Sequence, residues 1–404
     1  MQQQDRVAGA DFLRAAACLL VLIHHLILRI DLTKLGEGLR PTLTALRFGN
    51  FGVAIFFILS GFLLALPFWR SLDAGGAVPD LHIYALRRAA RIIPGYWVAL
   101  TAGFILSITL LGYALTPGLT MRYVSGLFFM NQWHWRTFFP VEGNGPLWSI
   151  SFEATSYVLL PLCFLWLFAI PENRRSPLVT RLAWLGIIAV MLIAHETFRT
   201  LSPPNEIDRG WQYGMQGGAK EWMPNYNPIG FFAVFALGAL AAGIQILLPR
   251  KRRIWFDIIA LACLAAAGLQ LPLSTGGPWE AYGWLGIPYA FPLFPVLIAA
   301  ALVTLSRSVL LAALLDNTVI RFTATISFGI YIWQDIVLTS MQTISPAIFG
   351  IGRDDPVQDW SIGCAVATPI IFLLASFSYF TLERPAIRSA ARITRKNSAI
   401  TQYS

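Results

Sequence analysis

The sequence predicts an all-α integral membrane protein, folded over residues 1–404 as one transmembrane domain with a bundle of about ten helices. Composition is the first observation: 56% of the residues are hydrophobic and 13% are charged, whereas a soluble domain carries about 25% charged residues. The mean hydropathy is +0.61. The second observation is a series of apolar runs of the length needed to cross a hydrocarbon layer, about 20 residues. They cover residues 12–30, 48–69, 93–115, 146–170, 179–198, 228–248, 254–272, 283–305, 318–346 and 360–382.

Three of these runs have features of their own. The run 12–30 is expected to be a retained helix, because Asp11 and Arg14 lie at its start and no signal-peptide cleavage site follows it. The run 48–69 contains small residues around Gly61, which predict close approach of another helix. The run 283–305 is rich in proline, so it is either one broken helix or a re-entrant element.

The basic residues predict how the chain is oriented. If the N-terminus is cytoplasmic and ten spans alternate, roughly 19 of the 30 Lys and Arg residues fall in inner segments and about ten in outer loops. Both termini are therefore expected in the cytoplasm. The net charge of +9 is then a topology signal and does not indicate nucleic-acid binding.

The two largest outer loops, about 116–145 and 199–227, are too short for a separate catalytic domain, so the chemistry is expected within the bundle. Both loops are dense in aromatic side chains. Two explanations stay open, anchoring at the membrane interface and a surface on which sugar rings stack. The aromatic residues are Trp133, Trp135, Trp211, Tyr213, Trp222 and Tyr226.

The first run carries a polar stripe. Arg14 and His25 are 11 residues apart, close to three helical turns, so they share one face about 16 Å apart along the axis. A polar stripe in lipid is costly, so this face should line a protein interior or an aqueous cavity. His25 titrates near neutrality and is therefore a candidate general base. His24 points about 100° away and is the weaker candidate, and a histidine that only bonds a neighbouring helix is the alternative for His25.

A basic patch precedes the third run. Arg87, Arg88 and Arg91 fall within about one and a quarter turns of an expected helix. Arginine forks bind phosphate bidentately, and coenzyme A carries a 3′-phosphate and a diphosphate. The alternative is topology charge in contact with anionic lipid headgroups.

An acidic residue, Glu153, lies inside the run 146–170, where an unpaired carboxylate is expensive. Three roles stay open: orienting His25, binding an acceptor hydroxyl, or pairing with an arginine of another helix.

No metal site is predicted, because the five histidines show no ligand spacing with cysteine or carboxylate partners.

Taken together, these motifs resemble acyltransferase family three, the integral membrane O-acyltransferases that modify lipopolysaccharide O-antigens, exopolysaccharides, Nod factors and some macrolides. The motifs occur in the family's order over nearly the whole chain. They are Asp11-Phe-Leu-Arg14 followed by His25, Phe56-Phe57-Ile-Leu-Ser60-Gly61-Phe62, Arg88-Ala-Ala-Arg91-Ile-Ile-Pro94-Gly-Tyr96-Trp97, Trp148-Ser-Ile-Ser151-Phe-Glu153, Phe235-Ala-Leu-Gly238 and Glu383-Arg-Pro385.

The resemblance implies a ten-helix acyltransferase core with acetyl-CoA or another acyl-CoA as the cytoplasmic donor. The implied acceptor is a carbohydrate or lipid-linked glycan, presented from the opposite side of the membrane. The implied location is the inner membrane of a bacterium. By position, His25 is the catalytic base, Arg14 its donor-side partner, and Arg88 and Arg91 the donor-phosphate site. The family's tryptophan-serine-glutamate element is matched by Trp148, Ser151 and Glu153; we assign Glu153 to catalysis, and Trp148 and Ser151 to substrate binding.

This sequence departs from the family pattern at two places. Phe12 stands where glycine is usual, which affects packing more than chemistry. In the ninth run, Tyr331 matches a family tyrosine, but Gln334 ends the motif where the family has histidine. Glutamine forms hydrogen bonds but does not carry the proton. We therefore predict Tyr331 and Gln334 as substrate-binding residues and no second catalytic histidine.

The resulting hypothesis is transfer of an acyl group, acetyl favoured, to a hydroxyl of a surface or exported carbohydrate. Direct transfer is the main version, and an acyl-histidine intermediate stays open. A proton-coupled transporter or flippase is the principal alternative, since intramembrane His, Arg and Glu also suit a carrier, although no matched halves are visible. A lipid-tail acyltransferase and a scaffold with a degenerate site are further alternatives. The homo-oligomeric state stays open, and membrane lipids are expected partners.

Overall fold

A computed structural model describes residues 7, 9–201, 206–249, 251–274, 277–278 and 280–401, without the side chains of 395–401. Within these residues the regular secondary structure is entirely helical. Eight segments of this described part are long and apolar enough to cross a membrane, which confirms the predicted all-α membrane bundle. The helices in these segments are α1 (Ala10–Ile27), α2 (Arg40–Leu46) with α3 (Gly52–Asp73), α4 (Leu81–Thr109), α6 (Trp148–Phe168), α7 (Pro177–Leu201), α9 (Pro228–Leu247), α10 (Ile254–Leu273), and α14 (Val357–Ser378) with α15 (Arg384–Thr401).

Two of the ten expected spans differ from the other eight. The run 283–305 is broken: a 3₁₀ turn covers Trp284–Gly286, and the helix α11 (Leu293–Leu305) has 13 residues, too few for a full crossing. The run 318–346 matches α13 (Thr318–Ile344), which has 27 residues but is not among the eight apolar segments. The shorter helices α5 (Pro117–Leu127), α8 (Gly214–Trp222) and α12 (Leu310–Leu315) complete the fold.

Local sequence explains where two functionally important helices begin. The side chain of Asp80 accepts a hydrogen bond of 2.9 Å from the Ile83 amide, so α4 starts 12 residues before the expected span 93–115. Arg88 and Arg91 consequently lie inside a continuous helix. Asn317 caps α13 in the same way, with a bond of 3.0 Å from the Ile320 amide.

The centre of the bundle is the packing of α3 against α9. A Cβ atom added to Gly61 would lie 2.0 Å from the Phe235 carbonyl oxygen, and one added to Gly238 would lie 2.0 Å from that of Ile58. The two backbones therefore touch, as the small residues of this run predict. On one side of this core, α1 packs against both α3 and α13, which places its polar stripe inside the protein.

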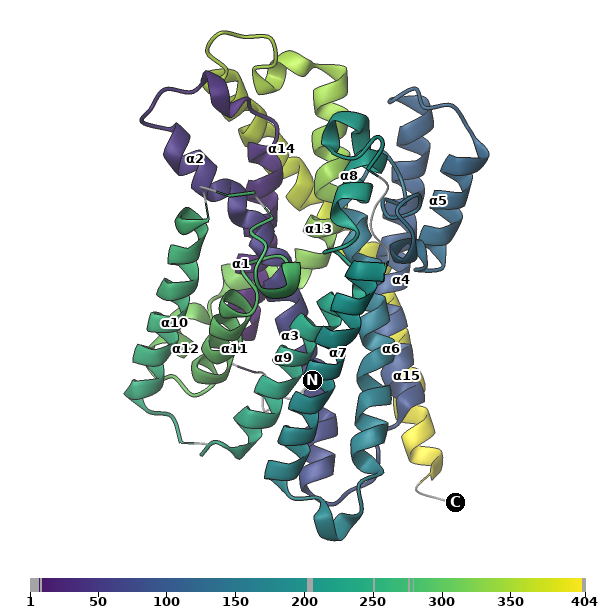
Figure 1. Cartoon of the computed structure of the whole chain (residues 1–404), viewed down its shortest axis with the longest axis vertical. Helices are drawn as coiled ribbons and strands as arrows, with labels where there is room; N and C mark the ends of the chain where they lie inside the picture. Colours follow the sequence, from purple (N-terminus) through teal and green to yellow (C-terminus); the bar gives the residue numbers. More distant parts are fainter. Residues whose placement is uncertain are drawn as a thin grey trace.

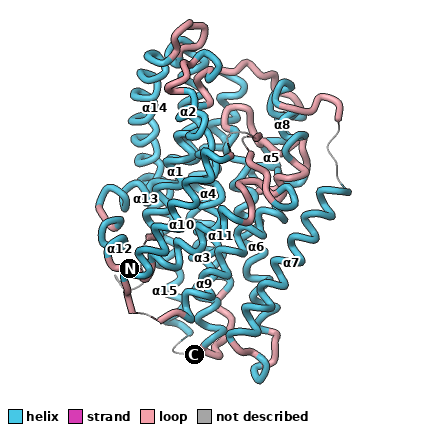
Figure 2. The backbone as a smooth tube through the Cα atoms, turned by 60° about the vertical axis from the view of Figure 1, so that its left-hand side comes forward, coloured by secondary structure: helices cyan, strands magenta, loops and turns pink. Residues whose placement is uncertain are grey.

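The short helices α5 and α8 lie at one end of the molecule. Figure 1 shows α5 and α8 at the end of the bundle opposite the C-terminus, with α15 running beside α4. Figure 2 shows, from another side, the loops collected around α2, α5 and α8. A π-helical turn, Tyr379–Glu383, joins α14 to α15 and carries the buried Glu383.

Candidate active site

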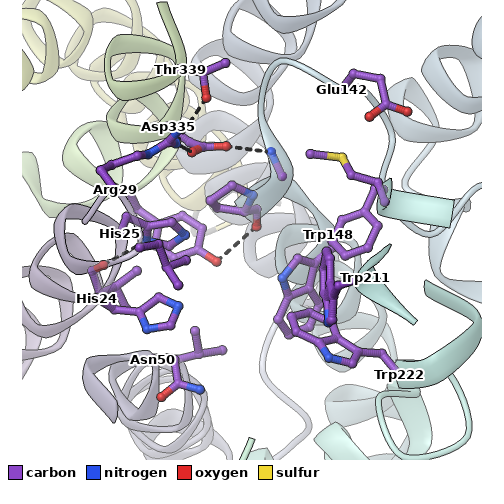
Figure 3. A pocket seen from close by; sticks show the side chains of 18 of the residues that line it. His24, His25, Arg29, Asn50, Glu142, Trp148, Trp211, Trp222, Asp335 and Thr339 are labelled. Atoms are coloured by element: carbon purple, nitrogen blue, oxygen red, sulfur yellow. Dashed lines mark hydrogen bonds and ion pairs between the residues drawn. The ribbon is translucent and has the colours of Figure 1, made fainter. Parts of the chain in front are cut away.

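A cavity of about 810 Å³ lies between the C-terminal part of α1, the middle of α13 and the segments before α6 and around α8. This volume is within the range of small-molecule sites, about 300–1,000 Å³. Figure 3 shows His24, His25, Arg29 and Asp335 on one side of the cavity and three tryptophans on the other. Three of the predicted site residues line it: His25, Trp148 and Tyr331.

The imidazole of His25 has a defined hydrogen-bond partner. Its Nδ1 lies 2.8 Å from the backbone oxygen of Val21, one turn earlier in α1. A carbonyl oxygen only accepts, so Nδ1 carries the hydrogen and donates it. In the neutral ring Nε2 is then the unprotonated nitrogen, which is the form that a general base requires.

His24 also lines the cavity, although its position on α1 suggested that it faces elsewhere. Its Nδ1 donates to the backbone oxygen of Arg47, and its ring lies 5.0 Å from that of His25, nearly perpendicular to it. His24 is 3% exposed. This bond holds the 3₁₀ segment that precedes α3 against α1.

An ion pair in the cavity was not predicted. Nη2 of Arg29 lies 2.5 Å from Oδ1 of Asp335 and 3.1 Å from Oγ1 of Thr339, and Nη1 donates to Gln342. The other carboxylate oxygen, Oδ2 of Asp335, accepts a bond of 2.9 Å from the Gly145 amide. Two features of the sequence could have indicated this pair. Arg29 lies one turn after His25, and Asp335 is the one acidic residue of the run 318–346.

Hydrogen bonds of Tyr331 tie α13 to the turn that leads into α6 and carries Trp148. The Tyr331 hydroxyl donates to the Pro146 backbone oxygen over 3.0 Å and pairs with Oγ of Ser149 over 2.5 Å. These bonds fix the turn before α6, and with it the indole of Trp148, which is 6% exposed.

Aromatic rings from distant segments form the far wall. Trp222 of α8 lies 5.9 Å from Trp148 and 4.9 Å from Trp211, measured between ring centroids, and both pairs meet edge to face. Trp211 and Trp222 come from the aromatic loop 199–227, whereas Trp133 and Trp135 do not line the cavity. The structure therefore separates the aromatic residues that reach the cavity from those that do not.

The three predicted donor-site arginines form a second cluster. Arg14, on the N-terminal part of α1, is within electrostatic range of Arg88 and Arg91 of α4, and all three are half-buried. Nη1 of Arg14 donates to Oδ1 of Asp11 over 3.2 Å, as its spacing predicts. Arg91 lies 3.8 Å from the buried carboxylate of Glu383, and Arg88 makes no ion pair within the described residues.

Glu153 belongs to this second cluster and does not line the cavity. Its Oε1 accepts a bond of 2.7 Å from Oγ of Ser60 and another from the hydroxyl of Tyr157, and Arg14 is within electrostatic range of that tyrosine. Ser60 lies two turns along α3 from Val53, which does line the cavity. Both hydrogen-bond donors to Glu153 are hydroxyl groups, and no ion pair joins it to an arginine within the described residues.

Two predicted substrate-binding residues lie outside the cavity lining. Oγ of Ser151 donates to Oδ1 of Asn131, which holds the loop before α6, and Ser151 has no exposed surface. Gln334 is also fully buried, and both its amide atoms are without a hydrogen-bond partner among the described residues. Neither side chain reaches the cavity in this arrangement. Within the described part, no group of three or more His, Cys, Asp or Glu side chains is placed to hold a metal.

Comparison with known proteins identifies the class to which this bundle and its cavity belong. Residues 7–376 match the family model described as an acyltransferase domain, so the chain belongs to acyltransferase family three and is an integral membrane acyltransferase.

Two curated proteins are similar over most of this chain. A putative peptidoglycan O-acetyltransferase, YrhL of Bacillus subtilis, is 24% identical over 410 residues, which cover 95% of this chain and 55% of YrhL. The exopolysaccharide production protein ExoZ of Rhizobium meliloti is 25% identical over 355 residues, covering 86% of this chain and 92% of ExoZ. The chain thus spans about half the length of YrhL and nearly all of ExoZ. No solved structure matches.

Proposed function

We propose that the protein transfers an acyl group, acetyl favoured, from cytoplasmic acyl-CoA to a hydroxyl of a surface or exported carbohydrate or a lipid-linked glycan. The observation that carries the proposal is His25, which lines the cavity with Nδ1 engaged by Val21 and Nε2 left to accept a proton. Family membership supplies the reaction class. The names of YrhL and ExoZ support O-acetyl transfer and an exported polysaccharide.

Arg14, Arg88 and Arg91 are proposed to hold the phosphates of coenzyme A. Three guanidinium groups gathered from α1 and α4 repel one another, so a polyanion between them is stabilising. Arginine is the side chain whose planar fork suits phosphate. The hydrogen-bonded Glu153 is proposed to order this site through Ser60 and Tyr157.

The spacing of the two sites suits the donor. Arg14 and His25 lie 11 residues apart on one helix, or about 16 Å. With the phosphates at the arginines, an extended pantetheine arm would bring the thioester toward His25. The acceptor would then meet the acyl group near mid-membrane, and acyl-CoA would stay on the cytoplasmic side. This agrees with both termini in the cytoplasm and a location in a bacterial inner membrane.

The proposed transfer is direct. Nε2 of His25 removes the proton of the acceptor hydroxyl as its oxygen attacks the thioester carbonyl. The new carbon–oxygen bond forms, the carbon–sulfur bond breaks, and the proton passes from the imidazolium to the leaving thiolate. The products are the O-acyl glycan and free coenzyme A.

The test uses purified full-length protein in nanodiscs with radiolabelled acetyl-CoA and envelope glycans as acceptor. We expect His25→Ala to abolish label transfer and leave acetyl-CoA binding intact, because the phosphate site lies elsewhere. The exposed His134 provides the matched control, and His134→Ala should transfer at the wild-type rate. Full activity of His25→Ala would overturn the assignment of the base. Absence of donor binding and turnover in the wild type would favour the transporter alternative.

A further inference from the structure

The cavity has two chemically different walls, and their combination indicates what occupies it. We propose that the space between the tryptophans and the Arg29–Asp335 pair is the acceptor subsite, and that it takes an uncharged sugar unit. This inference rests on the proposed function and names the acceptor class of the same site.

The aromatic wall suits the C–H face of a sugar ring. Trp148 and Trp222 are nearly buried, at 6% and 5% exposure, whereas Trp211 is 38% exposed although it lines the cavity. Trp148 and Trp211 each meet Trp222 edge to face, so the three indoles are not stacked face on face. An aromatic face gains binding energy from flat apolar surface while the polar edges of the ligand stay free.

The opposite wall supplies hydrogen bonds suited to hydroxyl groups. Arg29 and Asp335 form a fixed network with Thr339 and Gln342, and Nε of Arg29 is buried with no hydrogen-bond partner among the residues that the structure describes. Sugar hydroxyls both donate and accept, so they match a wall that presents an arginine next to a carboxylate. His25 lies on this same side in Figure 3, which brings a bound hydroxyl toward the proposed base.

Charge balance selects a neutral ligand. The charged side chains that line the cavity are two arginines and two acids: Arg29, Arg47, Glu142 and Asp335. Asp335 neutralises Arg29, Arg122 forms an ion pair with Glu142, and Arg47 is within electrostatic range of Glu280. A uronate or phosphate group entering here would meet a cation already held by a carboxylate, and it would lose its hydration without gaining a free partner. An uncharged sugar does not carry this cost.

The experiment compares two acceptor probes and three variants. The probes are a neutral tetrasaccharide of glucose and a tetrasaccharide of galacturonate, with radiolabelled acetyl-CoA and full-length protein in nanodiscs. The variants are Trp211→Ala, the conservative Trp211→Phe, and Trp133→Ala as the control. Trp133 is also an outer-loop tryptophan, 42% exposed, but it lies outside the cavity.

We expect wild type to acetylate the neutral probe with at least tenfold higher kcat/KM than the charged one. Trp211→Ala should raise KM for the neutral probe about tenfold, equivalent to about 1.4 kcal/mol, and Trp211→Phe should restore most of the loss. Trp133→Ala should keep the wild-type KM.

Equal use of the two probes, preference for the uronate, use of neither, or an unchanged KM in Trp211→Ala would overturn the neutral-sugar subsite. The proposed acyl transfer is judged separately, by acetyl-CoA binding and by His25-dependent transfer to envelope glycans. If those hold while the probe experiment fails, only the acceptor assignment falls.

Discussion

The ion pair between Arg29 and Asp335 is expected to hold the turn that follows α1 against α13 and to determine the cavity's shape. The two side chains are 15% and 10% exposed, and the charged atoms lie 2.5 Å apart. The perturbation is Asp335→Asn, which keeps an oxygen for the Gly145 amide but removes the charge. Arg29 then stays in a mostly buried place without a counter-ion.

The magnitude follows from burial. Breaking a buried ion pair by removing one partner costs about 3–5 kcal/mol, chiefly because the other charge is left uncompensated. Since part of Arg29 stays exposed and Thr339 and Gln342 still accept from it, we expect about 2–3 kcal/mol for Asp335→Asn. Arg29→Gln should cost a similar amount. The double variant should cost less than the two single changes added together, with a coupling of about 2 kcal/mol.

The assay measures the free energy of unfolding in mixed detergent and SDS micelles, with circular dichroism as the signal. It is applied to wild type, both single variants and the double variant. Acceptor KM is measured on the same preparations and should rise in both single variants. A coupling below about 0.5 kcal/mol, the limit of additivity, would refute the view that the pair stabilises the packing of α1 on α13.

Three other predictions concern packing, pH and the donor. Gly238→Ala should greatly reduce the amount of folded protein, because its Cβ would lie 2.0 Å from the Ile58 carbonyl oxygen. Gly186→Ala is the control and should be tolerated, because among the described residues its Cβ would meet no atom within 4 Å outside the backbone of its own helix. Size-exclusion chromatography measures the folded fraction of both variants. Burial raises the pKa of the Glu280 carboxyl above its usual range. The folded state therefore holds a proton that the unfolded state releases, so stability should fall as the pH rises through the raised pKa. Glu280→Gln should flatten this loss in thermal unfolding between pH 5 and 8, and an unchanged slope would contradict the assignment. Arg88→Gln should raise KM for acetyl-CoA about tenfold or more with little change in acceptor KM, and an unchanged donor KM would remove Arg88 from the proposed phosphate site.

The comparison with YrhL and ExoZ bears on how these results should be read. YrhL is about twice as long as the part that this chain matches, and ExoZ is matched over 92% of its length. The proposed chemistry resides in residues that lie within the matched acyltransferase domain, since Arg14 through Asp335 fall inside residues 7–376. Activity measured on this chain therefore tests the domain directly.

The sequence by itself determined the membrane class and the positions of most helices. Apolar length is a local property, so the run 318–346 predicted α13 (Thr318–Ile344) closely. Helical pitch predicted that Arg14 and His25 share one face of α1, on which both are half-buried. Capping is also local: Asp80 caps α4, which begins at Leu81, 12 residues before the expected span.

Only the tertiary structure decided which side chains meet. Asp335 is 306 residues from Arg29, and Trp211 and Trp222 reach the cavity because residues 211–222 lie against it. Helical periodicity gives the face on which Glu153 lies but not the helix opposite that face, and the structure places it beside Ser60 instead of His25. The partner of a helix face depends on packing between segments far apart in the chain, and this long-range packing is what determined the composition of the cavity.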